Sequence, residues 1–258
     1  RIQAQKSLSL SLFHRPSRHS FASEKYIDCD MVNCQIQIIM EKAKKIELNI
    51  DGLLEYCADP KKCRYDIVQH YDLKDIKTAE GVVISAYEQA KKLPIRLAFG
   101  GGLDKWKEDF DVSKKHKDLE FILKMAQTIK KIRVEIDREN SQIRRDLETK
   151  DDFKEKSDSE KLNSIMATYT QTWERALQEE CVAHLVRTYP SVRLHDVIPS
   201  QDGFMVLKSQ MVGTDLNDPF TSFSKILKSK FDLNIQWVQK EFDDIMPVDI
   251  YCDDLEKG

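Results

Sequence analysis

Residues 119–147 read LEFILKMAQTIKKIRVEIDRENSQIRRDL, and this stretch decides the expected fold of the chain. Isoleucine recurs at every seventh position, at Ile122, Ile129, Ile136 and Ile143. A seven-residue spacing keeps side chains on one side of an α-helix and is typical of coiled-coil seams. The accompanying positions are only partly apolar. The sequence therefore predicts a long helix, from residue 113 to about 150, with a narrow apolar seam.

A second long helix is expected to follow after a short, highly charged turn over residues 148–156. Ser157 and Glu160 have the spacing of a capping box, which marks a helix start. The helix then runs to about residue 188 and carries a broader, aromatic seam that includes Tyr169 and Trp173. Two helices joined by a short turn pack antiparallel, and each keeps a second apolar flank that needs covering. We therefore expect a helical hairpin that docks onto a partner.

The segment before this hairpin is expected to form a bundle of short helices. Asp28 and Asp30 precede a stretch with apolar steps of three and four residues, which predicts a helix over residues 31–56. The dipeptide at 59–60, Asp-Pro, has the N-cap and first-turn proline of a second helix. A third helix is expected over residues 79–93, with Thr78 as its cap and Pro94 as its stop.

After residue 190 the pattern changes to a small α+β unit. A turn-rich segment at 199–203, PSQDG, separates two apolar runs, which indicates a β-hairpin whose second strand extends to Val212. Asp218 and Pro219 then start a helix, and residues 233–238 are expected to form a third strand.

The expected fold class is mainly α, with a long antiparallel helical hairpin in a helical body and a small C-terminal α+β unit made of a β-hairpin and a helix. Only 8 glycines and 7 prolines occur in 258 residues, a balance that favours helices. The expected segments are a basic extended segment (1–27), the short-helix bundle (28–99), the helical hairpin (103–188), the α+β unit (190–252) and an acidic tail (253–258).

The composition of the N-terminal segment predicts a cellular location. Residues 1–23 contain six serines and four basic side chains but no Asp or Glu, which is typical of an organelle-import sequence. The sequence thus predicts a mitochondrial protein, in the matrix or at the matrix face of the inner membrane, with the intermembrane space as an alternative. The net charge is −3 although this segment contributes +4, so the remainder is acidic. An acidic body argues against nucleic-acid binding outside the N-terminal segment.

Four cysteines are the candidate metal ligands, in two pairs: Cys29 with Cys34, and Cys57 with Cys63. Four thiolates can hold a structural zinc ion, but these spacings exceed the two-residue gap of a zinc knuckle. Disulfides are a second interpretation, and reduced structural thiols are the favoured one. The run of three glycines at 100–102 lacks the order of a phosphate-binding loop and is interpreted as a hinge. We expect no cofactor and no metal.

The sequence shows no catalytic constellation, so the expected function is architectural. We expect a non-catalytic accessory subunit of a large mitochondrial assembly, most specifically a stalk or peripheral subunit of a respiratory-chain complex or ATP synthase, bound to other protein subunits and at most peripherally to a membrane. A mitochondrial ribosomal or RNA-associated protein is the alternative, and a soluble matrix enzyme or regulatory factor is the second. The residues expected to contact partners lie on the helical seams and after the glycine run: Ile122, Ile129, Ile136, Ile143, Tyr169, Trp173 and Trp106.

Overall fold

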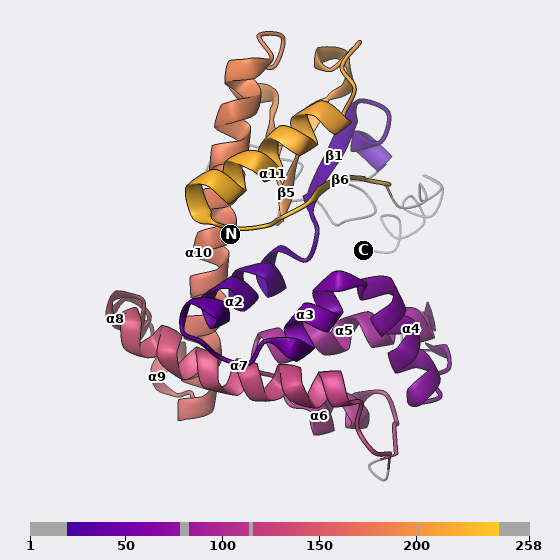
Figure 1. Cartoon of the computed structure of the whole chain (residues 1–258), viewed down its shortest axis with the longest axis vertical. Coiled ribbons are helices and arrows are strands. Elements are labelled where there is room, and N and C mark those ends of the chain that lie inside the picture. The colour runs from indigo at the N-terminus through magenta and orange to yellow at the C-terminus, as the bar shows by residue number, and fades with distance from the viewer. Residues whose placement is uncertain (1–19, 78–82, 114–115, 201, 243–258) are drawn as a thin grey trace, which may run out of the picture. The chain divides into compact units, whose positions relative to one another are not determined.

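The computed structural model describes residues 20–77, 83–113, 116–200 and 202–242. It is mostly helical with a small antiparallel sheet, which confirms the mainly α class (Figure 1). The chain forms two compact units. Unit 1 comprises Arg1–Cys34 and Glu174–Gly258, and unit 2 comprises Gln35–Trp173. The expected N-terminal import segment, up to residue 19, and the acidic tail at 253–258 lie outside the described residues.

Unit 1 is built on a four-stranded antiparallel sheet with the strand order β4-β5-β1-β6. Along the chain its elements follow the β-α-β-β-α-β order of a ferredoxin-like topology, with unit 2 inserted after the first strand. The elements are β1 (Tyr26–Met31), the second half of α10 (Asp158–Thr188), η2 (Leu194–Asp196), β4 (Ile198–Pro199), β5 (Gly203–Leu207), η3 (Lys208–Gln210), α11 (Asn217–Phe231) and β6 (Trp237–Lys240).

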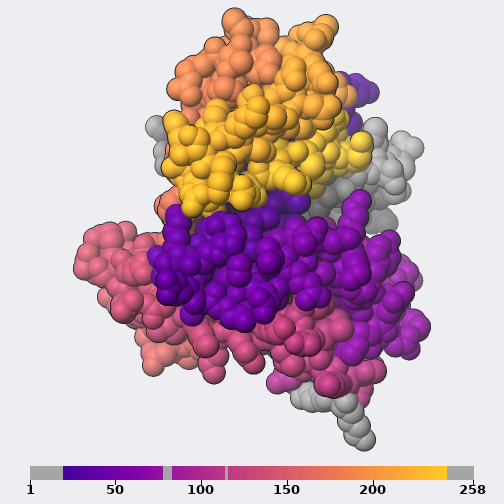
Figure 2. Space-filling model, in the orientation of Figure 1, coloured from indigo at the N-terminus to yellow at the C-terminus, as the bar shows by residue number. Residues whose placement is uncertain are grey.

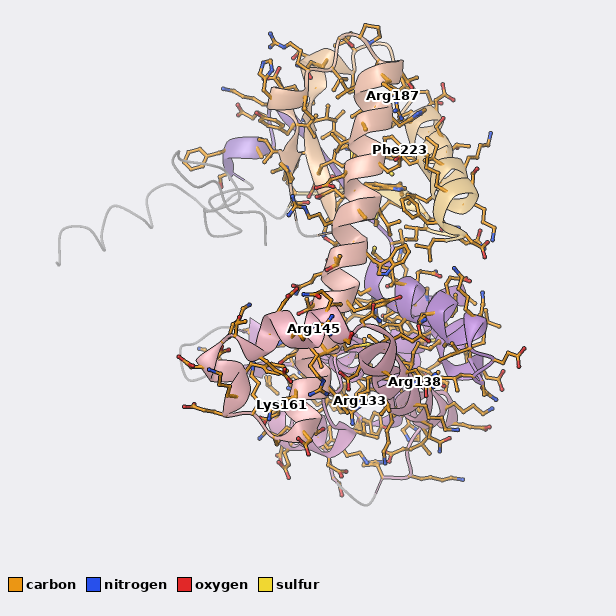
Figure 3. All side chains as sticks on the ribbon, turned by 90° about the vertical axis from the view of Figure 1, so that its left-hand side faces the viewer. Arg133, Arg138, Arg145, Lys161, Arg187 and Phe223 are labelled. Carbon is orange, nitrogen blue, oxygen red and sulfur yellow. The ribbon has the colours of Figure 1, made fainter. Side chains whose placement is uncertain are left out.

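The two faces of this sheet differ in chemistry. Residues directly opposite each other on neighbouring strands share a face, and successive residues alternate between faces. One face carries Cys29 opposite Phe204 and Met31 opposite Trp237. Phe223 of α11 stacks edge-on against both aromatic rings and lies between α11 and α10 (Figure 3). This buried aromatic layer is the core of unit 1, and it leaves the polar positions of β1 on the other face.

Unit 2 is helical, apart from a two-stranded ribbon of β2 and β3. Its elements are the body of α2 (Cys34–Lys45), α3 (Asp51–Ala58), α4 (Pro60–His70), β2 (Ile76–Lys77), β3 (Val83–Ile84), α5 (Ala86–Ala98), α6 (Leu103–Asp109), α7 (Glu120–Glu139), α8 (Ser141–Glu148), α9 (Asp151–Lys154) and the first half of α10.

Helix α7 is the central helix of unit 2 and packs against α3 and α5. Gly52 allows the close approach of α3, because a Cβ atom there would lie 2.4 Å from the carbonyl oxygen of Phe121. Side chains of the segment from 35 to 77 form one continuous surface in Figure 2, with those of α7 along its lower edge. No described helix has the combination of length and apolar character that crossing a membrane requires.

Several local sequence signals are confirmed. Asp59 caps α4 by accepting a hydrogen bond from the Lys62 amide at 2.9 Å. Ser157 and Glu160 form the expected capping box at the start of α10, where the Glu160 carboxylate accepts from the Ser157 amide at 2.9 Å. These signals act within one helical turn, which explains why the sequence predicts them well.

The expected helix over residues 31–56 is wrong at its start and in its middle. Asp28 and Asp30 do not precede a helix but lie within strand β1, and α2 begins only at Cys34. The chain then breaks after Lys45, where Glu47 has a positive φ of 58°, before α3 begins. The apolar steps from Ile36 to Ile50 continue across this break, so the periodicity merged two helices into one.

Four further boundaries differ from expectation. The helix expected at 79–93 is α5, which Ser85 caps and which contains Pro94 inside its length; Thr78 and Ala79 lie outside the described residues. The long helix expected to 150 is divided at Asn140 into α7 and α8. Strand β5 ends at Leu207 rather than at Val212, because a 3₁₀ turn follows. The third strand begins at Trp237.

Candidate functional site

Two carboxyl side chains meet on the face of the unit 1 sheet that lies opposite the buried aromatic layer. Asp30 lies at the end of β1, opposite Gly203, and its side chain shares a hydrogen bond with that of Asp202 in the β4–β5 hairpin. A third acidic residue, Asp28, is on the same face, two residues earlier on β1, and is 8% exposed. We call the Asp30–Asp202 group the carboxyl pair.

A lysine from the neighbouring strand completes the group. Lys240 of β6 pairs in register with Asp28, and its Nζ atom donates to Oδ2 of Asp30 at 3.2 Å. Residues 172 positions apart in the sequence, Asp30 and Asp202, are thus brought together because β1 occupies the centre of the sheet between β5 and β6.

The hairpin that carries Asp202 is fixed by backbone contacts. The Met31 amide donates to the Asp202 carbonyl at 2.9 Å, and the Ser200 amide donates to the Gly203 carbonyl at 2.9 Å. The side-chain amide of Gln178, a buried residue of α10, donates to the carbonyls of Ser200, at 3.0 Å, and Gly203. A buried side chain that satisfies two turn carbonyls holds the turn in one conformation. Gln178 is therefore a positioning residue for Asp202.

Gly203 is required where the hairpin meets β1. A Cβ atom at this position would lie 1.9 Å from the carbonyl oxygen of Cys29, so a larger residue cannot occupy it without moving a strand. The dipeptide Asp202-Gly203 thus combines a carboxylate with the backbone approach that places it beside Asp30.

The electrostatics of the carboxyl pair are those of two acids sharing one proton. Burial and then the charge and hydrogen bond of Asp202 raise the pKa of Asp30 from 3.8 to about 7, and Lys240 opposes this rise. Burial acts to lower the pKa of Lys240, but the charges of Asp30 and Asp202 outweigh it and raise this pKa. Two carboxyl groups at short range cannot both ionise without a large electrostatic cost, unless a cation compensates their charges.

The raised pKa predicts that the metal-free protein loses stability as the pH rises. The folded state holds a proton on Asp30 that the unfolded chain releases near pH 3.8, so this contribution is complete below that pH and is lost up to about pH 7. Urea unfolding in EDTA should give a lower midpoint at pH 8 than at pH 5. The Asp30→Asn variant, which cannot ionise, should show a smaller difference; an equal difference in both proteins would contradict a shared proton.

The four candidate cysteine ligands are divided between the two units. Cys29 and Cys34 belong to unit 1, and Cys57 and Cys63 to unit 2. All four are free thiols, and burial raises the pKa of each, to about 12 for Cys57 and about 11 for Cys63. A raised pKa keeps a thiol protonated and weakens it as a metal ligand. Among the described residues, no group of three or more His, Cys, Asp or Glu side chains is arranged around a metal position.

The candidate contact residues lie mostly inside unit 2. Ile122, Ile129, Ile136 and Trp106 are at most 2% exposed, and the indole N–H of Trp106 donates to the Gln89 carbonyl at 3.0 Å. Tyr169 is buried too, and its ring lies 6.3 Å from that of Trp173. Ile143 and Trp173 are half-buried. The seam of α7 is thus covered by the chain's own helices, which the heptad spacing does not distinguish from cover by a partner.

The carboxyl pair itself was missed by sequence reasoning. Residues 26–31, YIDCDM, alternate apolar and polar side chains, which is the pattern of a strand with one polar face. Asp202 stands before a glycine in the predicted hairpin turn. These two signals together would have placed acidic residues on a strand and on a neighbouring turn.

No model of a known protein family matches the chain, and no curated protein matches it significantly.

Proposed function

We propose that unit 1 is the catalytic part of an enzyme that transfers a phosphoryl or nucleotidyl group from a nucleoside triphosphate with the help of a divalent cation. The observation that carries this proposal is the carboxyl pair, Asp30 and Asp202, with Lys240 beside it. Mg²⁺ is usually held in proteins by one or two carboxylates, with water and substrate phosphates as the remaining ligands. Two carboxylates are therefore sufficient, although they do not form a complete protein cage.

The chemistry of the pair supports a cation in place of the shared proton. Burial and the neighbouring charge of Asp202 raise the pKa of Asp30. When both carboxyls are ionised, the same two neighbouring charges attract a divalent ion. Asp28 adds further negative charge on the same face. A cation in such a site neutralises charge that develops on a transferring phosphoryl group.

Lys240 distinguishes this proposal from an acid–base dyad like that of aspartic proteases. Such a dyad functions by keeping one carboxyl protonated, whereas here the ammonium group 3.2 Å from Asp30 opposes the rise in the pKa of that carboxyl without reversing it. A lysine beside a carboxylate-held cation instead suits a substrate with several negative charges. The ammonium group can shift from Asp30 to a phosphate oxygen when the cation compensates the carboxylates.

The first experiment measures cation binding directly. Mn²⁺ titrated into the full chain at pH 8 and followed by electron paramagnetic resonance should show one or two saturable sites in the presence of a nucleoside triphosphate. Asp30→Asn should bind Mn²⁺ at least about tenfold more weakly, because an ionised ligand is lost. Asp196→Asn, a half-buried control in the same unit whose carboxylate pairs with Arg193, should bind normally.

Equal Mn²⁺ affinity in the wild type and in Asp30→Asn would contradict the proposal. In that case the sequence-based hypothesis, an accessory subunit of a mitochondrial assembly, would take precedence. Three exposed apolar side chains of unit 2 favour that second function: Leu54 of α3 and Leu123 and Val134 of α7. Co-migration of the chain with a large complex on a native gel of organelle extract would then support it.

A further inference from the structure

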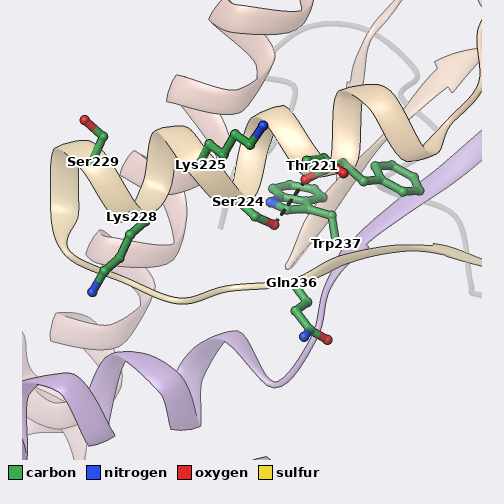
Figure 4. Close-up of a pocket in the computed structure, with 8 residues that line it drawn as sticks. Thr221, Ser224, Lys225, Lys228, Ser229, Gln236 and Trp237 are labelled. Atoms are coloured by element: carbon green, nitrogen blue, oxygen red, sulfur yellow. Dashed lines mark hydrogen bonds between the residues drawn. The ribbon is translucent and has the colours of Figure 1, made fainter.

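A groove on unit 1 lies apart from the carboxyl pair, between α11 and the segment that leads into β6 (Figure 4). Its volume is about 630 Å³. The lining residues on α11 include Thr221, Ser224, Lys225 and Lys228, and Trp237 closes the groove from β6. Trp237 faces the core side of the sheet in register with Met31, whereas Asp30 faces the other side. The groove and the carboxyl pair are therefore independent sites.

The floor of the groove contains a buried donor that lacks an acceptor. Trp237 is 95% buried, and its indole N–H has no hydrogen-bond partner within the described part of the chain. In Figure 4 the nitrogen edge of this ring faces Ser224 on the wall of the groove. The Ser224 hydroxyl donates to the Phe220 carbonyl at 3.1 Å. Leaving a buried N–H without an acceptor costs about 1–3 kcal/mol, so an acceptor beyond the described residues is expected here.

The rim of the groove is cationic and rich in donors. Lys225 and Lys228 are almost one helical turn apart on α11. The hydroxyl-bearing residues Thr221 and Ser229 of the same helix also line the groove. Lys228 is held by Asp232, whose carboxylate lies 2.5 Å from its Nζ atom. Lys225 is therefore the groove lysine whose charge no described carboxylate compensates. The lining thus offers donors of three kinds: a ring N–H, hydroxyls and an ammonium group. A ligand that consists mainly of acceptors and carries negative charge matches this lining.

We propose that this groove binds a phosphate group of a small ligand, with Lys225 as the main charge partner and the indole N–H of Trp237 as the buried donor. A phosphate offers several acceptor oxygens, so it can accept from the indole and from the ammonium group at once. The site goes beyond the proposed phosphoryl transfer, since it uses none of the residues of the carboxyl pair. It would place a bound anion against the back of the strand that carries Lys240.

The test uses the indole ¹H–¹⁵N resonance of Trp237 in the full chain, assigned by its loss in Trp237→Phe. Inorganic pyrophosphate is the probe, titrated in EDTA so that no divalent cation loads the carboxyl pair. We expect a saturable shift of the Trp237 signal with a dissociation constant of about 1 mM or below, the range of a simple anion site. The Trp106 signal, whose N–H is bonded to Gln89, should stay in place.

Matched variants separate the groove from general charge effects. Lys225→Ala should weaken pyrophosphate about tenfold, because a charge-assisted hydrogen bond is lost. Lys230→Ala, on the same helix but paired with Glu180 at 2.7 Å, should bind like the wild type. Asp30→Asn should also bind pyrophosphate like the wild type. The groove can therefore be tested independently of the proposed transfer activity. An unsaturable shift, or an equal loss in Lys225→Ala and Lys230→Ala, would overturn the proposal.

Discussion

Replacing Asp202 with Asn is expected to lower cation-dependent turnover of nucleoside triphosphates by about 100-fold or more. The substitution keeps the size of the side chain and the backbone contacts of the hairpin, but it removes the ionised ligand opposite Asp30. Stabilisation of developing phosphoryl charge by a bound cation amounts to several kcal/mol, and each 1.36 kcal/mol corresponds to about a tenfold change in rate.

Two assays measure this effect and define the reaction. One follows release of phosphate or pyrophosphate from nucleoside triphosphates with Mg²⁺ or Mn²⁺, and the other follows nucleotide incorporation on a primed template. Asp196→Asn, whose carboxylate instead pairs with Arg193 at 2.8 Å, is the matched control. If Asp202→Asn and Asp196→Asn are equally active in every assay, the carboxyl pair has no catalytic role. Thermal unfolding of both variants confirms that the loss is not a loss of fold.

Gly203→Ala is expected to destabilise unit 1 by at least about 3 kcal/mol, a severe effect for the addition of one methyl group. The new Cβ atom would lie 1.9 Å from the Cys29 carbonyl oxygen and 2.9 Å from its carbonyl carbon, and both belong to the central strand β1. To relieve this clash, β5 must move away from β1, which breaks the strand pairing that brings Asp202 beside Asp30.

The measurement is urea unfolding followed by circular dichroism and by tryptophan fluorescence. Met205→Leu, two residues along the same strand, is the control, because a volume-conserving change in a core costs less than about 1.5 kcal/mol. A Gly203→Ala protein as stable as Met205→Leu would mean that β1 and β5 do not approach as closely as described. We also expect Gly203→Ala to lose Mn²⁺ affinity, since the hairpin moves with its carboxylate.

The sequence predicts features that depend on neighbouring residues and misses those that depend on distant ones. The Asp59 cap, the Ser157–Glu160 capping box and the mainly helical class all follow from spacings of three or four residues. The α7 seam was identified too, although its burial against α3 required knowledge of which helix lies next to it. Local pattern therefore identifies helices but not their neighbours.

The strand pairing of the unit 1 sheet could not be predicted from the sequence, for a physical reason. Strand β1 pairs with β5 and β6, which follow it by more than 170 residues, and no local signal specifies such a partner. Asp28 and Asp30 are compatible with a helix cap and equally with the polar face of a strand. The apolar run that follows them favoured the helix cap. The site was missed because its residues become neighbours only after the strands pair.

The insertion of unit 2 after β1 has a consequence for folding on the ribosome. Unit 2 is complete once residue 173 has emerged, and it depends mostly on contacts between nearby helices, which form fast. Strand β1 must meanwhile wait for β5 and β6, with both of its hydrogen-bonding edges open. An apolar strand with open edges is a template for pairing with other chains. Polar Asp28 and Asp30 interrupt the apolar character of this strand, so the same carboxylates protect the nascent chain against aggregation.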